Sequence, residues 1–568
     1  MATYYWVGGN GTWDNSNKAN WAIVSNGAGG NGPPTSSDNV NFDANSGTGT
    51  CTTAAGSACA TAVLNSSTLG LTLGANHTMS GTFTLTAGTL SLGTNTLSCN
   101  IFNSSNSNTR TIAFGTGNIT LTGSGTTIWT TGTTTNLSVT GTPVVNCTYS
   151  GSVGTRTISI SSSTIEAQSI SFNFSSGSDI IASVGVTKNL NFTGFTGTLN
   201  AATRTIYGNL TLGTGMTTAS GASNTTFAGS SGPYTWRSNN VTLNNPVVVN
   251  IPSQTLSLFD NANTGSNKLT VTAGTFDLNS KTLTCDNFNS SNSNVRTLAF
   301  GTGSITLTGS GVVIWTTSTA TNLSVTGTPV VNCTYSGSTG TRSITANNIS
   351  LGGTESIAIS FNITAGSDTI ALNTTSPNSY KNIDFTGFSG TLSNGGASTT
   401  IYGNLTVSSG MSLSSGANTM SFAGTSGPYT ITTNNKTFDF PIEFVGISGT
   451  WQFANALTQG STRTFTVTNG TVKLKAGATT TVGSFLTSGS NQKYLQSTTA
   501  GSQATLSQAS GTVNASYLTI KDINATGGAT WNAYRSLSNI DAGNNTGWDF
   551  LSTPVTTTTL AMRLGFGL

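Results

Sequence analysis

The chain has 568 residues, of which 6% are charged and 69 are glycine, and its formal net charge is +3. Long helices favour Ala, Leu, Glu and Lys, whereas this chain is rich in Thr, Ser, Asn and Gly, so a helical protein is excluded. The balance of 19 basic and 16 acidic residues also argues against nucleic acid or an anionic membrane surface as a partner.

Residues 1–80 are predicted to form an N-terminal cap and the first coils of a repetitive structure. The first half of this segment is dense in aromatic rings and contains the Pro33-Pro34 pair. It lacks a charged start and an apolar run of signal-peptide length, which predicts synthesis in a cytoplasm without general secretory export. No run reaches the roughly 18 apolar residues of a membrane span, so no membrane insertion is expected.

From residue 81 the sequence consists of short alternating runs separated by Gly, Asn or Ser. Alternation of apolar and polar residues predicts strands with one buried face. Because hydrophobic residues make up 35% and aromatic residues 8% of the chain, packed strands are favoured over disorder. The runs expected in the first part are 82–85, 89–92, 96–99, 111–114, 118–121, 126–129, 136–139 and 144–147.

The sequence also repeats itself after about 190 residues, a period typical of stacked architectures. Residues 135–152, TNLSVTGTPVVNCTYSGS, recur unchanged as residues 321–338. A partial third copy begins at FTVTNGT, residues 465–471. The predicted divisions are 1–80 (cap and first coils), 81–268 (first copy), 269–464 (second copy), 465–550 (partial third copy and closing cap) and 551–568 (tail).

A parallel β-helix explains the continuity of these copies better than a row of sandwiches does. Sandwich domains would leave linkers between copies, and no Pro-rich or charged linker separates them. We therefore predict an all-β solenoid with coils of roughly 20–25 residues, three short strands per coil and distinct terminal caps. Outward Thr, Ser and Asn would form side-chain ladders, and the stack would be a durable rod.

Cysteine and histidine usage gives no sign of a metal site or cofactor. The six cysteines include two repeat-equivalent pairs, Cys99 with Cys285 and Cys147 with Cys333, and there is no CxxC pattern beside the single His77. Buried free thiols are expected. A disulfide between Cys51 and Cys59 is the alternative.

Both ends of the chain resemble a known group of proteins. The segments are YYWVGGNGTWDNSNKANW (4–21), PTSSDNVNFD (34–43) and ATGGATWNAYRSLSNIDAGNNTGWDF (525–550). Together with repeats such as IYGNLTVSSGMSLSSGANTMSFAGTSG (401–427), they are similar to β-helical structural proteins of tailed bacteriophages. The middle of the chain shares its composition with filamentous-haemagglutinin-like and autotransporter passenger repeats. The phage resemblance implies a fibre or a capsid-surface decoration, located in the virion and bound to other capsid or tail proteins.

Some phage β-helices cleave polysaccharide, and a chain with that activity would contain a suitable pair of acidic residues. Glycoside hydrolysis requires two carboxyl groups roughly 5–10 Å apart. The best candidates are Glu166 with Asp179, repeated as Glu355 with Asp368, but their separation does not match a coil. Corner or ladder roles are the expected ones, and no catalysis is predicted. The repeated Arg110 and Arg296, and Arg156 and Arg342, are expected to cap strand carbonyls or pair with these acids.

Repeated aromatic residues suggest a second role, stacking against the rings of a host-surface polysaccharide. The candidate glycan-contact residues are Trp129, Trp315, Tyr207 and Tyr402. Packing inside the stack or at its corners explains the recurrence equally well.

The leading hypothesis is a non-enzymatic virion structural protein with a candidate role in attachment, and the alternatives are a secreted bacterial adhesin or surface rod and a polysaccharide-depolymerising tailspike. A homo-oligomer is expected, with a trimer favoured. The tail alternates apolar residues with small or basic ones, so it is predicted to anchor the protein by strand addition, against the alternative of a frayed terminus. The anchoring residues are Leu560, Met562, Leu564, Phe566 and Leu568.

Overall fold

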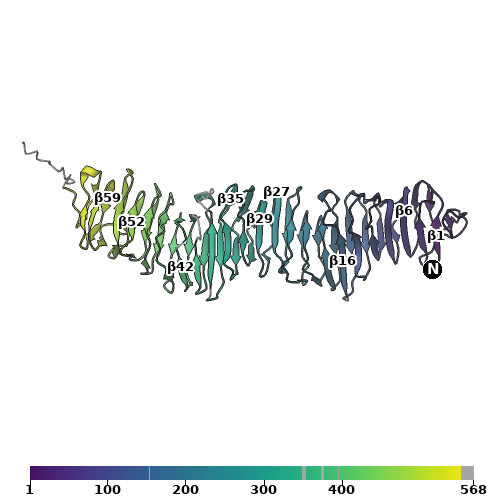
Figure 1. Cartoon of the computed structure of the whole chain (residues 1–568), viewed down its shortest axis with the longest axis horizontal. Coiled ribbons are helices and arrows are strands. Elements are labelled where there is room, and N and C mark those ends of the chain that lie inside the picture. The colour runs from purple at the N-terminus through teal and green to yellow at the C-terminus, as the bar shows by residue number, and fades with distance from the viewer. Residues whose placement is uncertain (153, 339, 348–353, 373–376, 395, 552–568) are drawn as a thin grey trace, which may run out of the picture. The chain divides into compact units, whose positions relative to one another are not determined.

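The computed structural model describes residues 1–152, 154–338, 340–347, 354–372, 377–394 and 396–551. The chain forms a β-solenoid in which short strands pair in parallel with strands of neighbouring coils (Figure 1). Among the described residues, the helical turns are three 3-10 turns, η1 (Glu166–Gln168), η3 (Glu355–Ile357) and η4 (Arg535–Leu537). The predicted all-β, parallel solenoid is therefore confirmed.

The chain divides into two compact units. Unit 1 comprises Met1–Gly309 with Asn322–Pro329, and unit 2 comprises Ser310–Thr321 with the chain from Val330 onward. The division lies inside the second sequence copy and not at the junction between copies. The sequence repeat and the compact units are thus different divisions of the same chain.

Unit 1 is built from parallel ladders that each continue through many coils. One contains β1 (Thr3–Trp6), β4 (Asn39–Phe42), β6 (Thr61–Leu73), β8 (Thr82–Ser91), β10 (Ile101–Asn103), β13 (Thr127–Thr131), β16 (Thr155–Ile160), β18 (Ile180–Val184), β21 (Thr198–Leu199) and β24 (Thr217–Thr218). A second joins β6 and β8 to β2 (Gly11–Trp13), β5 (Gly49–Thr53), β11 (Arg110–Ala113) and β14 (Leu137–Thr140).

Two further ladders of unit 1 share two long strands, β27 (Val247–Leu258) and β29 (Leu269–Asp277). One ladder runs through β7 (His77–Thr78), β9 (Thr96–Cys99), β12 (Asn118–Leu121), β15 (Val144–Cys147), β17 (Ser171–Phe174), β20 (Leu190–Asn191), β23 (Leu210–Thr211), β26 (Tyr234–Arg237), β27, β29, β32 (Arg296–Ala299) and β35 (Leu323–Thr326). Another contains β19 (Val186–Thr187), β22 (Arg204–Ile206), β25 (Thr225–Phe227), β27, β29 and β31 (Phe288–Asn289), and a shorter one contains β28 (Ala262–Asn263), β30 (Thr282–Cys285) and β33 (Ser304–Leu307).

Unit 2 has the same architecture. Its longest ladder is β36 (Val330–Cys333), β38 (Ser360–Ile363), β41 (Ile383–Asp384), β44 (Leu405–Thr406), β47 (Tyr429–Thr432), β50 (Thr450–Phe453), β53 (Thr471–Leu474), β56 (Lys493–Ser497), β59 (Leu518–Lys521) and β62 (Ile540–Asp541). Beside it lie β34 (Val313–Thr317), β37 (Thr341–Ala346), β39 (Thr369–Ala371), β42 (Thr391–Ser393) and β45 (Ser412–Leu413).

Three further ladders complete the described part of unit 2. They are β40 (Asn378–Tyr380), β43 (Thr399–Ile401), β46 (Met420–Phe422), β49 (Ile442–Phe444), β52 (Thr464–Val467) and β55 (Ser484–Thr487); β48 (Thr437–Phe438), β51 (Thr458–Gln459), β54 (Thr479–Val482), β57 (Ala504–Gln508) and β60 (Ile523–Thr526); and β58 (Thr512–Asn514) with β61 (Thr530–Asn532).

The alternating sequence pattern determines which side chains face inward. In β9 and β12 the exposure alternates strictly, with Leu97, Cys99, Ile119 and Leu121 buried. The expected runs 96–99, 118–121 and 144–147 match β9, β12 and β15 residue for residue. The runs 82–85 and 89–92 were expected to be separate, but they form the single strand β8. It turns the corner at Gly88, whose φ of +95° suits glycine.

Coils are longer in places than the sequence predicts. Adjacent coils are joined by hydrogen bonds between residues 22 apart at Thr61 and Asn39, but 29 apart at Asn136 and Ser107. Parallel stacking tolerates this because an insertion at a corner leaves the paired strands in register.

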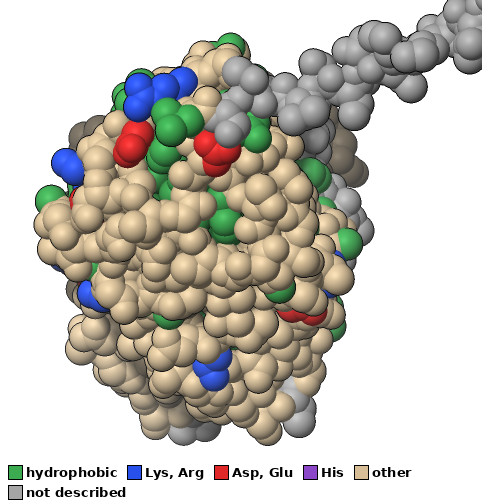
Figure 2. Space-filling model, turned by 90° about the vertical axis from the view of Figure 1, so that its left-hand side faces the viewer, with side chains coloured by type: hydrophobic (Ala, Val, Ile, Leu, Met, Phe, Trp, Pro, Cys, Tyr) green, Lys and Arg blue, Asp and Glu red, His purple; other side chains and the backbone are tan. Residues whose placement is uncertain are grey.

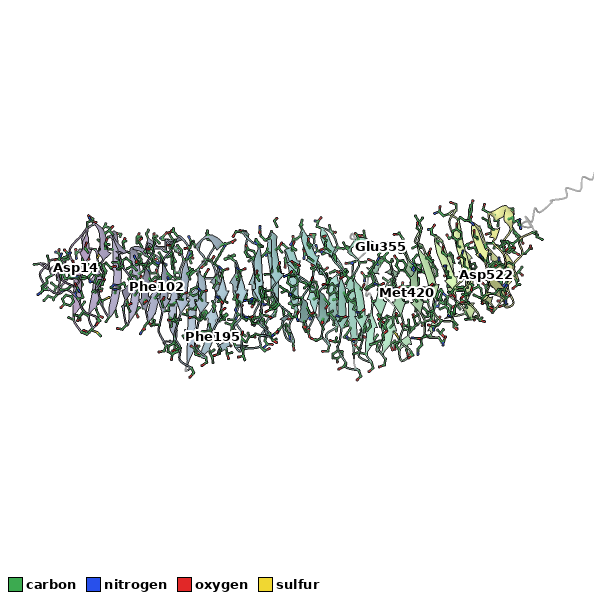
Figure 3. All side chains as sticks on the ribbon, turned by 180° about the vertical axis from the view of Figure 1, so that it is seen from behind. Asp14, Phe102, Phe195, Glu355, Met420 and Asp522 are labelled. Atoms are coloured by element: carbon green, nitrogen blue, oxygen red, sulfur yellow. The ribbon has the colours of Figure 1, made fainter. Side chains whose placement is uncertain are left out.

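The interior of each unit is filled by apolar and aromatic side chains from successive coils. In unit 1, the rings of Phe83, Phe102 and Trp129 stack with centroid separations of 5.7 and 4.4 Å. In unit 2, Phe422 stacks on Phe444 at 5.1 Å. Figure 3 shows Phe102 within the strands of unit 1, whereas Glu355 lies at the margin of unit 2. Each inward residue therefore contacts its counterparts in the coils before and after it.

Aromatic residues gather in the first coils of unit 1 and in the last described coil of unit 2. Trp6, Trp13 and Trp21 are fully buried and meet edge to face at 5.1–5.2 Å, and β3 (Trp21–Ala22) pairs antiparallel with β1. In the last coil Trp531 and Trp548 meet at 5.0 Å. The view onto this end in Figure 2 shows a few apolar and charged side chains on a largely uncharged polar surface. Antiparallel pairing with β3 thus covers an edge of β1 that would otherwise be open, while the rings fill the interior.

All six cysteines are free and buried, which confirms the expected buried thiols and leaves no Cys51–Cys59 disulfide. Cys99 and Cys147 both pair with Leu121 in the ladder, so these thiols occupy ordinary core positions. Burial raises the pKa of Cys59 to about 12. The thiols are therefore held in their protonated, unreactive form.

Candidate functional site

The acidic residues singled out in the sequence are bound by different cations. Asp179 binds the guanidinium of Arg156, with Nε and Oδ2 2.5 Å apart, and both side chains are at most 1% exposed. Glu166 instead accepts a hydrogen bond from the Nζ of Lys188 at 2.9 Å. Each acid therefore has its own cation, which confirms the expectation that Arg156 pairs with one of these acids.

The same two ion pairs recur in unit 2. Arg342 Nε lies 2.6 Å from Asp368 Oδ2, and Lys381 Nζ lies 2.9 Å from Glu355 Oε1. Tyr149 and Tyr335 cover the corresponding arginines, with guanidinium-to-ring distances of 5.3 and 4.9 Å. Because each pair joins residues of different coils, its effect is to tie coils together.

Glu166 also collects hydroxyl and backbone donors from a more distant coil. Its Oε2 accepts the N–H and the hydroxyl of Ser230 at 2.8 and 2.7 Å, and its Oε1 accepts the hydroxyl of Ser231 at 2.9 Å. Burial by itself raises the pKa of Glu166, but the hydrogen bonds from Ser230, Lys188 and Ser231 outweigh it and lower the pKa to about 2. A carboxylate held ionised in this way is a poor proton donor for glycoside cleavage.

Trp129 and Trp315 are core residues. Both indole rings are 0% exposed, and their Nε1–H groups donate to the hydroxyls of Thr131 and Thr317 at 3.0 and 3.1 Å. No ring face is available to a sugar, so the proposed glycan contact is corrected for these two residues. The physical reason is the direction of the side chain. Each Trp lies on the inward side of its strand, whereas the sequence shows only that it lies near a strand end.

Tyr207 and Tyr402 lie at the surface beside the Glu166 and Glu355 clusters and are half-buried. The hydroxyl of Tyr207 donates to the carbonyl of Thr164 at 3.2 Å. Burial, and then the charge of Glu166, raises the pKa of Tyr207; burial and Glu355 act in the same direction on the pKa of Tyr402. These two tyrosines stay candidates for ligand contact.

Arg110 caps carbonyl groups at a corner, as expected from the sequence. It is 1% exposed and donates to the carbonyls of Ser104, Asn108, Thr133 and Thr135. The repeat-equivalent Arg296 donates in the same way to Ser290 and Asn294. A buried cation at this position stabilises carbonyls that turn away from the strand ladder.

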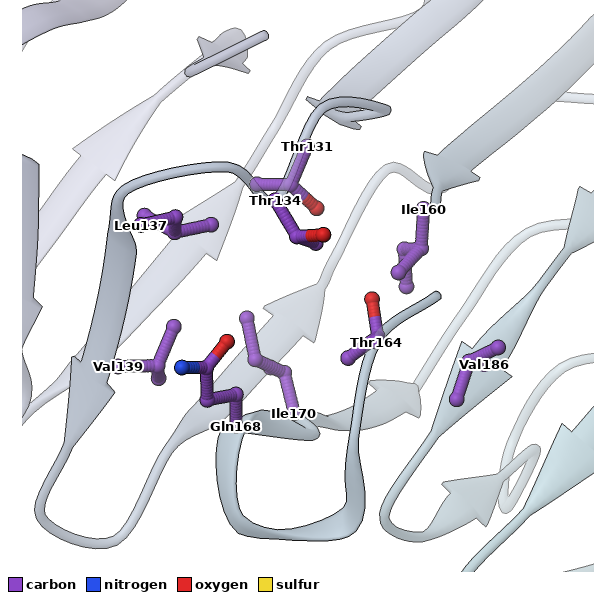
Figure 4. Close-up of a pocket in the computed structure, with 9 residues that line it drawn as sticks. All are labelled: Thr131, Thr134, Leu137, Val139, Ile160, Thr164, Gln168, Ile170 and Val186. Carbon is purple, nitrogen blue, oxygen red and sulfur yellow. The ribbon is translucent and has the colours of Figure 1, made fainter. Parts of the chain in front are cut away.

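Two depressions differ sharply in what they can hold. A cavity of about 10 Å³ beside η1 is lined by apolar side chains such as Ile170, by threonines such as Thr131 and Thr164, and by Gln168 (Figure 4). This volume suits at most one water molecule. By contrast, an open trough of about 650 Å³ crosses the corners of unit 1, where its polar lining includes Asn45, Asn65, Asn108 and Asn136.

Sequence reasoning missed the trough. A usable signal was present in the corner sequence NSSNSNTR, residues 103–110, which recurs as NSSNSNVR, residues 289–296. Because Asn, Ser and Thr are abundant throughout the chain, these asparagines do not stand out in the sequence. Only the stacked structure shows that asparagines of several coils line one trough. The predicted anchoring residues Leu560, Met562, Leu564, Phe566 and Leu568 lie outside the described residues.

Comparisons with known proteins leave function to be argued from the chain itself. No family model, curated protein or solved structure matches it. In the part of the chain that the structure describes, no helix has the length and apolar character needed to cross a bilayer. No cluster of three or more potential metal ligands occurs among those residues either.

Proposed function

We propose that this chain is a non-enzymatic structural protein of a virion, a β-helical fibre or a capsid or tail decoration that takes part in attachment. The observation that carries the proposal is the use of its repeated charges. Glu166, Asp179 and their counterparts in unit 2 are bound by cations and tie coils together. A solenoid whose charged groups serve its own cohesion is suited to a passive, durable structure.

The resemblance of residues 4–21, 34–43 and 525–550 to phage structural proteins supports the virion as the location. It also implies other capsid or tail proteins as partners. The proposal has one direct test, which is to label purified particles with an antibody to the protein and locate the label by electron microscopy. Label at a fixed position on the particle is expected, and absence of the protein from purified particles would contradict the proposal.

The rival depolymerase function is tested on the pure protein. Host capsule or lipopolysaccharide is incubated with it, and chain length is followed by size-exclusion chromatography. No shortening is expected, because Glu166 is ionised well below neutral pH and Asp179 is bound to Arg156. Shortening that disappears in the Glu166→Gln variant would replace the structural proposal with an enzymatic one.

A further inference from the structure

The trough in unit 1 is assembled from successive coils. Asn45 follows β4, Asn65 lies in β6, Ala87 lies in β8, and Asn108 and Asn136 precede β11 and β14. With strands spaced by about 4.8 Å, four steps along the stack span roughly 19 Å. The volume of about 650 Å³ falls within the range of ligand sites, and the elongated arrangement suits a chain more than a compact molecule.

Backbone hydrogen bonds fix the orientation of two amides in the trough. The Nδ2 of Asn108 donates to the carbonyl of Thr86 at 3.1 Å, and the Nδ2 of Asn136 donates to the carbonyl of Ser107 at 2.9 Å. A carbonyl can only accept, so the amide nitrogens must face the backbone. Both Oδ1 atoms are consequently left to accept hydrogen bonds from outside.

The other end of the trough also presents acceptors. The Nδ2 of Asn45 donates to the hydroxyl of Ser25 at 2.9 Å, which ties this amide to a neighbouring loop. The Oδ1 of Asp43 accepts the N–H of Asn45 at 2.9 Å, and its second oxygen is a further acceptor. The trough is thus edged by oxygen atoms whose positions are set before a ligand arrives.

The corner beneath these groups is held firmly. Arg110 lies under it and donates to the carbonyls of Asn108 and Thr135, both at 2.9 Å. Asn136 has a φ of +55°, a left-handed conformation that asparagine tolerates better than most residues. Ordered acceptors lose little conformational entropy on binding, which favours recognition.

The lining selects the chemistry of the ligand. It contains no Lys or Arg to attract an anionic polymer and no large apolar side chain to bury a hydrophobic peptide. The amide oxygens accept hydrogen bonds, and the hydroxyls of Ser67, Ser107 and Thr109 both donate and accept, so the lining suits a ligand rich in hydroxyl groups. We propose that this trough binds a neutral polysaccharide chain through its hydroxyl groups. The inference rests on the attachment role proposed above and gives that role a site and a ligand class.

The second copy supplies a matched control. Asn322 is the repeat counterpart of Asn136, with a φ of +57°, and its Nδ2 donates to the carbonyl of Ser293 at 2.9 Å. It does not line the trough. Asn136→Gly and Asn322→Gly therefore remove the same local bond and keep the same backbone conformation, but only the first alters the trough.

The test measures binding of the full chain to immobilised dextran, mannan and galactan, with alginate as the acidic comparison. We expect at least one neutral polymer to bind and alginate to bind more weakly, because carboxylates are repelled by outward oxygens. Asn136→Gly should weaken binding about three- to tenfold, the effect of one lost hydrogen bond, while Asn322→Gly leaves it unchanged. Asn65→Arg, which fills the trough, should weaken it more than tenfold.

Failure to bind any neutral polymer, or equal effects of Asn136→Gly and Asn322→Gly, would overturn the inference. Circular dichroism of each variant excludes loss of fold as the cause. Particle labelling separates this outcome from the proposed function. A labelled particle without polysaccharide binding refutes the trough alone, whereas binding by a protein absent from particles refutes the virion role alone.

Discussion

Arg156 and Asp179 form a buried ion pair at a position that two apolar side chains could also fill. The pair is at most 1% exposed, and the Nη1 of Arg156 is buried with no hydrogen-bond partner. Such a pair adds little net stability over apolar packing, but loss of one partner leaves an uncompensated charge. Its value lies in fixing which coil residues meet, since the contact joins two coils.

Asp179→Asn is therefore expected to destabilise unit 1 by about 3–5 kcal/mol, the usual effect of leaving one buried charge unpaired. Asp439→Asn provides the control. Its partner Arg463 is 2.8 Å away, but the side chains are 22% and 39% exposed, so the expected loss is under about 1 kcal/mol. Urea unfolding followed by circular dichroism measures both, and similar losses for the two variants would contradict the interpretation.

His77 is expected to make the stability of the folded chain depend on pH. It is buried against Trp13, with ring centroids 4.9 Å apart, and burial lowers its pKa from 6.5 to about 4. The unfolded chain then binds the proton more readily than the folded chain between these values, so stability is full above about pH 6.5 and falls as the pH drops toward 4. The shift corresponds to about 3 kcal/mol at most.

Unfolding of the N-terminal cap, followed by tryptophan fluorescence at several pH values, measures this dependence. His77→Phe keeps an aromatic ring beside Trp13 and removes the titration. The variant should lose the component of the pH dependence between pH 4 and 6.5. If wild type and variant depend on pH identically, His77 is not the group responsible.

At the scale of single elements, corners limit what the chain tolerates more than strands do. β8 passes from one ladder to another at Gly88, where φ is +95° and an added Cβ would lie 2.3 Å from the carbonyl oxygen of Ser66. Gly93, the next corner, has φ of +61° but open space around it. The first glycine is required by close approach of two coils, and the second only by its backbone conformation.

Gly93→Ala should therefore cost about 1–2 kcal/mol, the penalty for a left-handed residue with a Cβ. Gly88→Ala should cost clearly more, because the added methyl group also pushes two coils apart. Comparative urea unfolding of the two variants checks the order. An equal effect would show that the coils can separate locally at Gly88 without strain.

At the scale of the whole molecule, uncovered strand edges decide where another chain could add. In unit 1, β3 pairs with one edge of β1, so strand addition to that edge of β1 is blocked. Anchoring and oligomerisation are therefore expected to use a dedicated segment. The alternating tail, residues 560–568, is the segment that the sequence provides.

Deleting Leu560–Leu568 should leave the solenoid folded and remove its anchor. We expect unchanged circular dichroism, loss of incorporation into particles and, by light scattering, a change from a homo-oligomer, with a trimer favoured, to a single chain slightly lighter than the 57.7 kDa of the full-length chain. A full-length protein that already scatters as a single chain would contradict the oligomer. Unchanged incorporation of the truncated protein would contradict the anchor.

The sequence by itself determined the class of fold and the inward positions of the strands whose residues alternate strictly. Strict alternation in residues 96–99 and 118–121 predicts the buried side chains, because the side-chain period of a strand does not depend on its partners. For the recurring Arg110 and Arg296 the sequence predicted either capping of carbonyls or pairing with an acid, and the contacts show the first. Local pattern was sufficient wherever the deciding interaction lies within one strand or one corner.

Only the tertiary structure decided which coils meet at each position. It turned Trp129 and Trp315 inward, gave Glu166 and Asp179 separate cations, and brought Asn45, Asn65, Asn108 and Asn136 to one trough. These outcomes depend on register between residues about 20 to 30 positions apart, which corner insertions change without altering any strand pattern. Because the corners differ in length, the residues of one coil do not show which residues of the next coil lie beside them. The ion pairs and the lining of the trough are therefore seen only in the stacked structure.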